Sequence, residues 1–248
     1  MTKDLNIKLN PGERIDDLIL KDFKIIQNKN EFCFALDAIL LANFVKIKRN
    51  SEIIDLGTGT GVIPIILAAR GAQKILGIDI NKSLIDMAKR SVKLNNLSDK
   101  VDFVNADLRT IKEVLPANCT DIIVTNPPYY KVNSGFLNSN ENIAIARHEI
   151  KITLSEIIEN ASYLIKNGGS FFMIHIPERI DEIIFKLNEL KLYPRNIQFV
   201  YPNIKKSPNM LLIEAISGEK KQINILPPLI VYDTNGEYTE DIKKLFQK

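Results

Sequence analysis

Cysteine and histidine are scarce in this chain, with two of each among 248 residues. Cys33 and Cys119 lie in neither a Cys-x-x-Cys pattern nor a histidine-rich segment. This argues against a zinc site and favours a reducing compartment. We therefore expect that the protein requires no metal.

Long hydrophobic runs are also missing. The polar residues 1–8 contain no hydrophobic signal core, and no apolar stretch reaches the length of a membrane span. We therefore expect a cytoplasmic protein that makes no membrane contact.

No charge of one sign dominates: the formal net charge is +3, with lysine and arginine spread along the chain. Such a balance neither requires nor excludes a nucleic-acid partner. A hydrophobic content of 45% is enough for a full core, and no internal repeat is visible. The chain should form one large domain, or one domain with a small extension.

Short apolar strands alternate with helical segments from residue 51 onward. Strands are predicted over residues 52–55, 74–79, 101–104 and 121–125, and helices between them over 62–69, 82–95 and 108–114. The second half adds a helix over 153–165 that ends at Gly168-Gly169, a strand over 170–176, a helix over 178–190, and an antiparallel pair over 195–201 and 210–217. This order predicts a doubly wound α/β fold with a mostly parallel, seven-stranded sheet.

The flanking segments have distinct predictions. Residues 1–50 should form an N-terminal cap with a short β-pair within 23–34 and a helix over 36–45, ahead of a main domain over 51–248. The polar stretch 131–141 is expected to be a flap, and residues 227–232 an extended edge segment.

The most informative motif is Asn126-Pro127-Pro128-Tyr129, which follows the apolar strand 121–125. Two prolines stiffen the backbone and leave its carbonyl groups free as acceptors. The Asn126 side chain and the Pro127 carbonyl can both accept from one planar NH2 group, and Tyr129 offers a ring on which a flat group can stack. The motif predicts methylation of a nitrogen, although a plain Pro-Pro turn is the alternative.

A glycine-rich loop supplies the second motif. Asp55 is followed by Gly57, Gly59 and Gly61 between a predicted strand and a helix. Glycines at alternate positions let the backbone approach a ligand closely. An acid before the first glycine suits a cation rather than a pyrophosphate, so the loop favours S-adenosylmethionine, whose ammonium and sulfonium groups Asp55 can attract.

Two further acids end the next predicted strands. Asp79 is placed to accept from the ribose hydroxyls of the cofactor, and Asp107 from its adenine amino group. Each acid alone could equally be a helix N-cap or a solvated residue. Their order along successive strands predicts one ligand site at the carboxyl edge of a parallel sheet.

Over nearly its whole length the sequence resembles the S-adenosylmethionine-dependent adenine-N6 methyltransferases that act on valine tRNA beside the anticodon. The segments that carry this resemblance, besides the two motifs, are residues 34–42, 146–149, 175–179 and 226–232. The resemblance implies the Rossmann-like fold of class I methyltransferases, with S-adenosylmethionine as cofactor and tRNA as partner.

The resemblance also implies roles for particular residues. Asn126 and the Pro127 carbonyl would bind the target amino group beside the cofactor, Tyr129 would stack on the flipped adenine, and Leu36 and Asp37 would close over the methionine end. Candidate phosphate contacts are Lys131, Arg147, His148, Lys205 and Lys206, each of which could instead be a solvated surface charge. Pro208, in the last of these segments, departs from the family pattern.

Three other activities remain open. Enzymes that methylate a glutamine in release factors use the same Asn-Pro-Pro-Tyr turn on a side-chain amide, but they carry a helical domain ahead of the glycine loop, where this chain has about 50 residues. A DNA adenine methyltransferase would need a target-recognition insertion, and none is visible. A non-catalytic module that binds S-adenosylmethionine has no need of the turn.

Overall fold

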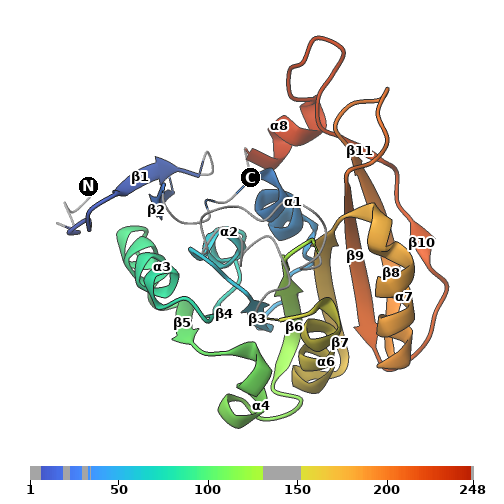
Figure 1. Ribbon diagram of the computed structural model, residues 1–248, viewed down its shortest axis with the longest axis horizontal. Coiled ribbons are helices and arrows are strands. Elements are labelled where there is room, and N and C mark those ends of the chain that lie inside the picture. Colours follow the sequence, from blue (N-terminus) through green and yellow to red (C-terminus); the bar gives the residue numbers. More distant parts are fainter. Residues whose placement is uncertain (1–6, 19–22, 30–32, 34, 131–151, 247–248) are drawn as a thin grey trace.

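The computed structural model describes residues 7–18, 23–29, 33, 35–130 and 152–246 (Figure 1). Its centre is a nine-stranded sheet in the order β10-β8-β9-β7-β6-β3-β4-β5, with β11 also paired to β8. The strands are β3 (Glu52–Leu56), β4 (Lys74–Asp79), β5 (Val101–Asn105), β6 (Thr120–Thr125), β7 (Ile165–His175), β8 (Leu192–Tyr201), β9 (Met210–Ser217), β10 (Asn224–Ile225) and β11 (Leu229–Ile230). Strand β9 runs antiparallel to both neighbours, and the other pairs are parallel.

The predicted doubly wound architecture is confirmed. Seven strands of the central sheet have five or more residues, and the last two of these, β8 and β9, form the expected antiparallel pair. The sheet exceeds the prediction by β10 and β11, which have two residues each. Strands so short carry no periodic signal, although β11 falls within the predicted edge segment.

Helices cover both faces of the sheet (Figure 1). One layer contains α1 (Leu36–Phe44), α2 (Val62–Ala69), α3 (Lys82–Leu94) and α8 (Glu240–Phe246); the other contains α4 (Ile111–Val114), α6 (Leu154–Leu164) and α7 (Ile180–Glu189), with 3-10 turns η1 (Leu108–Thr110) and η2 (Pro177–Arg179). Adjacent strand residues such as Ile53 and Ile54 join opposite cores, because successive side chains alternate across a strand. Leu41 of α1 is fully buried in the first core, so the helical part of the N-terminal segment packs into the main domain.

The N-terminal β-pair and the start of β7 differ most from their predicted positions, and β8 begins at Leu192 where 195 was expected. Strand β2 (Lys24–Asn28) lies within the expected range 23–34, but its partner β1 (Glu13–Asp17) lies upstream of it. Strand β1 escaped notice because Ile15 is its one apolar residue and is exposed. Strand β7 begins at Ile165, directly after α6, so that Gly168-Gly169 lies inside the strand where its register against β6 shifts.

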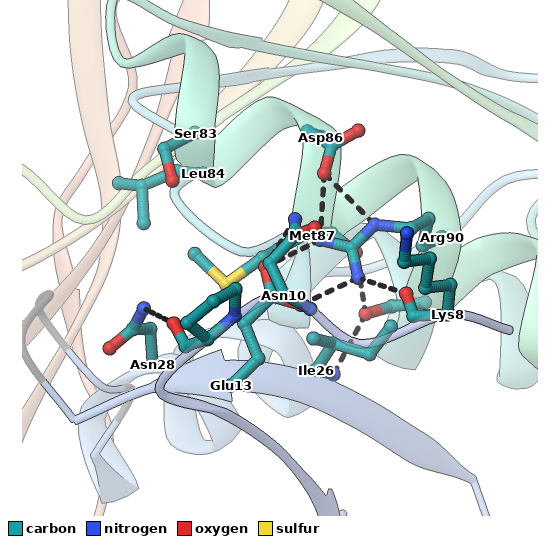
Figure 2. A network of polar contacts seen from close by, with 12 residues as sticks. Lys8, Asn10, Glu13, Ile26, Asn28, Ser83, Leu84, Asp86, Met87 and Arg90 are labelled. Atoms are coloured by element: carbon teal, nitrogen blue, oxygen red, sulfur yellow. Dashed lines mark hydrogen bonds and ion pairs between the residues drawn. The ribbon is translucent and has the colours of Figure 1, made fainter.

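The β1–β2 hairpin is fixed to the outer side of α3 (Figure 2). The Arg90 guanidinium donates to both carboxylate oxygens of Glu13, at 2.6 and 2.7 Å, and also to Asp86. Ser91 Oγ accepts from the backbone N–H of Ile26 at 2.9 Å. Ile26 packs on Leu84, which lines the cavity described next, so α3 connects the hairpin to that cavity.

Candidate active site

A cavity of about 650 Å³ lies at the carboxyl edge of the sheet, where β3, β4 and β6 end side by side. It is bounded by the loops after these strands and by the start of α1. Its lining includes Asp37, Gly57, Gly59, Asp79, Ile80, Asn81, Lys82, Asp107, Leu108, Asn126, Pro127 and Pro128. The glycine loop and the Asn-Pro-Pro-Tyr turn, which are far apart in sequence, therefore share one cavity.

The three glycines of the loop have positive φ angles of 75°, 57° and 82° at Gly57, Gly59 and Gly61. Other residues rarely adopt this conformation. A Cβ atom on Gly61 would lie 2.7 Å from Cζ of Phe103, whereas at Gly57 and Gly59 it would meet nothing within 4 Å. Gly61 is therefore required by packing as well as by backbone geometry, and the other two leave open space beside the cavity.

Asp79 joins the loop to the end of β4. Its carboxylate accepts from the backbone N–H of Gly59 at 2.9 Å and from that of Asn81 at 2.8 Å. Burial raises the pKa of this carboxyl group, although the hydrogen bonds from these two N–H groups act to lower it. Each oxygen keeps a further lone pair, so Asp79 can also accept from hydroxyl groups in the cavity that it lines.

Asp55 differs from Asp79 in its surroundings. Its side chain is fully buried in β3 and does not line the cavity. Neither carboxylate oxygen has a hydrogen-bond partner among the residues that the structure describes. Burial raises the pKa of Asp55 to about 7. A buried acid without a partner is costly in the protein alone, and a nearby cation would relieve that cost.

Asp107 lines the cavity, but its carboxylate is already engaged. It caps η1 by accepting from the backbone N–H of Arg109 at 2.9 Å, and it pairs with the Arg109 guanidinium at 2.5 Å. The ion pair is half exposed and contributes little to stability. Arg109 was not anticipated from the sequence.

The Asn-Pro-Pro-Tyr turn follows β6 directly. Thr125 at the end of this strand donates its hydroxyl to the Leu56 carbonyl at 2.9 Å, which ties the turn to the start of the glycine loop. Asn126, Pro127 and Pro128 line the cavity, whereas Tyr129 does not.

Tyr129 is held by three elements. Its hydroxyl lies 2.7 Å from Oδ2 of Asp37 and 2.7 Å from Oδ1 of Asn126. Its ring meets the edge of the His175 ring, with centroids 5.3 Å apart, and its carbonyl accepts from Arg179 Nη1 at 3.4 Å. Burial, and then the Asp37 carboxylate, raise the pKa of the hydroxyl well above its ordinary value.

His175 and Arg179 form the support behind the turn. His175 Nδ1 accepts from the backbone N–H of Ile176 at 2.8 Å, which leaves the ring proton on Nε2 in the neutral form. Burial, and then the charge of Arg179, lower the pKa of His175 to about 4. The motif over 175–179 was noted in the sequence without a role, and its partners come from distant elements.

The structure describes two of the five residues that were predicted to contact phosphates. Lys205 and Lys206 are exposed in the loop after β8 and do not line the cavity. Lys131, Arg147, His148 and the predicted flap over 131–141 lie outside the described residues. Sequence reasoning also missed Asn81, the N-cap of α3, and Ile80, both of which line the cavity.

Family comparison identifies the class of protein. A family model described as a methyltransferase domain matches residues 47–234. The chain belongs to this methyltransferase family. No helix of this methyltransferase, within the residues described, is long and apolar enough to cross a membrane.

Curated relatives carry a narrower name. A tRNA1(Val) (adenine(37)-N6)-methyltransferase from Flavobacterium psychrophilum is 32% identical over 180 residues, covering 71% of this chain and 75% of the relative. One of the same name from Haemophilus influenzae is 25% identical over 227 residues, covering 91% and 94%. The resemblance inferred from the motifs is confirmed.

Solved structures agree on the fold. A predicted O-methyltransferase from Agrobacterium tumefaciens has a TM-score of 0.68 at 23% identity, covering 85% of this chain and 95% of that structure. A tRNA m1G37 methyltransferase from M. jannaschii has a TM-score of 0.60 at 18% identity, covering 86% and 57%. At these identities the likeness extends to the Rossmann-like fold alone.

Proposed function

We propose that this methyltransferase transfers the methyl group of S-adenosylmethionine to the exocyclic nitrogen of an adenine in tRNA, and that the target is the adenosine 3′ of the anticodon in a valine tRNA. The observation that carries the proposal is that Asn126 and Pro127 share a cavity with Gly57, Gly59 and Asp79. The names of the curated relatives support the same substrate.

The donor set around the cavity fits the cofactor. Asp79 would accept from the ribose hydroxyls, Asp107 and its neighbour Leu108 would contact the adenine, and the open side of Gly57 and Gly59 would admit the methionine chain. The buried carboxylate of Asp55 would supply negative potential for the ammonium group. When bound, S-adenosylmethionine supplies an electrophilic methyl group.

The turn would prepare the target nitrogen. The amino nitrogen of adenine is a poor nucleophile because its lone pair is delocalised into the ring. If Asn126 and the Pro127 carbonyl accept its two hydrogens, a pyramidal nitrogen is favoured and its lone pair is oriented for attack. A strong base is not required, because the nitrogen proton becomes acidic on alkylation.

The RNA would enter from the carboxyl edge of the sheet. An anticodon-loop base can be unstacked at low cost because it is not held in a duplex. Lys205 and Lys206 follow the carboxyl end of β8, three strands from β6, or roughly 14 Å at ordinary strand spacing. They would contact phosphates of the same loop or stem.

The test is methyl transfer to total tRNA from a strain that lacks this gene, followed by digestion to nucleosides and mass spectrometry. We expect N6-methyladenosine with the wild-type protein. Asn126→Ala should lower turnover at least about 100-fold while cofactor affinity stays within a few-fold. Asn167→Ala, at an exposed position near the opposite end of β7, is the matched control.

Two outcomes would contradict the proposal. Methyl label in a protein fraction and none in tRNA would favour the glutamine-methylating alternative. Equal losses of turnover and cofactor affinity in Asn126→Ala would remove the role assigned to that side chain.

A further inference from the structure

The Tyr129 hydroxyl lies between two acceptors. It is 2.7 Å from a carboxylate oxygen of Asp37 in α1 and 2.7 Å from Oδ1 of Asn126 in its own turn. A hydroxyl carries one proton and cannot donate fully to both. One of these contacts must therefore be the weaker, or the Asn126 amide must turn.

The Asp37 carboxylate is the stronger acceptor for the Tyr129 proton, because hydrogen bonds to a charged acceptor are about twice as strong as neutral ones. Asp37 is 6% exposed, so little water competes for it. The tyrosine cannot move away from this acceptor easily, because its ring contacts His175 and its carbonyl accepts from Arg179.

With its proton on Asp37, the tyrosine oxygen is an acceptor on its other side. An amide has oxygen and NH2 ends of nearly the same shape, which a half-turn exchanges. The half-turn would place Nδ2 of Asn126 toward the tyrosine oxygen as a donor. Oδ1 would then face away from Tyr129, toward the cavity that Asn126 lines.

We propose that Asp37 is a positioning residue. It sets the donor–acceptor direction of the hydrogen bonds that connect Asn126, Tyr129 and Asp37, so that Asn126 presents its oxygen to the target amino group. This inference rests on the proposed function. It differs from the role that family resemblance implies for Asp37, which is closure over the methionine end of the cofactor.

Loss of the Asp37 carboxylate should reverse the donor–acceptor direction of these hydrogen bonds. In Asp37→Asn the new amide can donate to the tyrosine oxygen, and the Tyr129 proton then has Asn126 Oδ1 as its remaining acceptor. That oxygen becomes a poorer acceptor for the substrate. Removal of the hydroxyl in Tyr129→Phe keeps the ring but disconnects Asp37 from Asn126 altogether.

The test is a double-mutant cycle with Asp37→Asn and Tyr129→Phe, read as turnover on tRNA. We expect Asp37→Asn to lower kcat about tenfold or more, a change on the scale of one lost acceptor, with affinity for S-adenosylhomocysteine within threefold. In the Tyr129→Phe background the same substitution should change kcat less than twofold. Asp99→Asn, at an exposed position, is the matched control.

A readout without substrate accompanies the cycle. Asp37 raises the pKa of Tyr129, so ultraviolet titration of Asp37→Asn should show one tyrosine ionising at lower pH, and that change should be absent in the double variant. This measurement also reports whether the variant keeps the folded environment of the ring.

The outcomes separate the two proposals. If the wild-type protein forms no N6-methyladenosine in tRNA, the proposed function fails. If it does, but Asp37→Asn lowers kcat by the same factor with and without the Tyr129 hydroxyl, the positioning role fails. A loss of cofactor affinity as large as the loss of kcat would likewise overturn it, in favour of direct action on the cofactor.

Discussion

Gly59 donates its backbone N–H to the carboxylate of Asp79 at 2.9 Å. This bond connects the glycine loop to the end of the next strand, so the position of the loop depends on the Asp79 carboxylate. The second oxygen of Asp79 accepts from Asn81, where α3 begins. One side chain thus fixes the relative positions of β3, β4 and α3 at the cavity.

Replacement of Asp79 should therefore weaken cofactor binding through both its direct contacts and the loop. In Asp79→Asn the side-chain NH2 must face one of the two backbone donors. We expect the Kd for S-adenosylhomocysteine to rise about 10- to 100-fold in calorimetry, the scale of one or two bonds to a charged group. Asp99→Asn should bind as the wild type does, and an unchanged Kd in Asp79→Asn would contradict the assignment.

Asp55 should make the unfolding free energy depend on pH. Its pKa is raised to about 7 in the folded protein, against about 3.9 in an unfolded chain. Between these values the unfolded chain releases a proton that the folded protein keeps, so stability falls as pH rises from about 4 to about 7 and then levels off. Asp55→Asn removes this titration while preserving the side-chain shape.

Urea unfolding of both proteins at several pH values tests this. The stability of Asp55→Asn relative to the wild type should grow from pH 4 to 7, by up to about 4 kcal/mol, while its affinity for S-adenosylmethionine falls. A difference that does not change with pH would mean that Asp55 is ionised in the folded protein throughout this range.

The sequence specified the regular parts of the fold best. Helix α2 and strand β4 were predicted residue for residue, because α2 is an apolar run between Gly61 and Gly71, and β4 is an apolar run that ends at Asp79 before Asn81. Strand β1 was not recognised, because a polar hairpin held by Arg90 has no hydrophobic pattern of its own. Gly168-Gly169 was interpreted as a helix end, although the pairing of Ile165 with Thr120 had already begun the strand.

The sequence motifs predicted which residues belong to the site, but not how deeply each side chain is buried. Asp55 and Asp79 both end predicted strands, yet Asp55 is buried with no hydrogen-bond partner in the described part of the chain, whereas Asp79 lines the cavity. Which face and depth a strand-end side chain occupies depends on packing that one sequence does not display. The contact between Asp37 and Tyr129 joins residues 92 positions apart, and the packing of α1 against the sheet brings them together.

Gly77 should be intolerant of even a methyl group. Its φ lies outside the positive range, so alanine is allowed by the backbone, but a Cβ atom there would lie 2.5 Å from Cδ1 of Phe103 and 2.7 Å from Oγ1 of Thr58. Gly77→Ala should lower the unfolding free energy by about 1–3 kcal/mol through overpacking. Phe103→Leu should recover part of this loss, and urea unfolding of the four proteins in the cycle measures it. If the losses of unfolding free energy in Gly77→Ala and Phe103→Leu add strictly in the double variant, the clash is relieved by a shift that does not involve Phe103.

Lys205 and Lys206 should contribute to RNA affinity and not to chemistry. They lie at the carboxyl edge of the sheet, where the cavity is, and no ion pair among the described residues holds them. The double change to alanine should raise KM for tRNA several-fold with kcat unchanged. It should also flatten the dependence of log Kd on log salt by about 1 to 2 units, because two phosphate contacts are lost.

The matched control removes the same charge from the opposite edge. Lys220 and Lys221 follow β9, which runs antiparallel to its neighbours, so they lie at the amino ends of the parallel strands. Their double change to alanine should leave both KM and the salt dependence unchanged. If both pairs reduced affinity equally, the effect would be one of net charge, and the RNA-binding face would have to be sought away from the loop after β8.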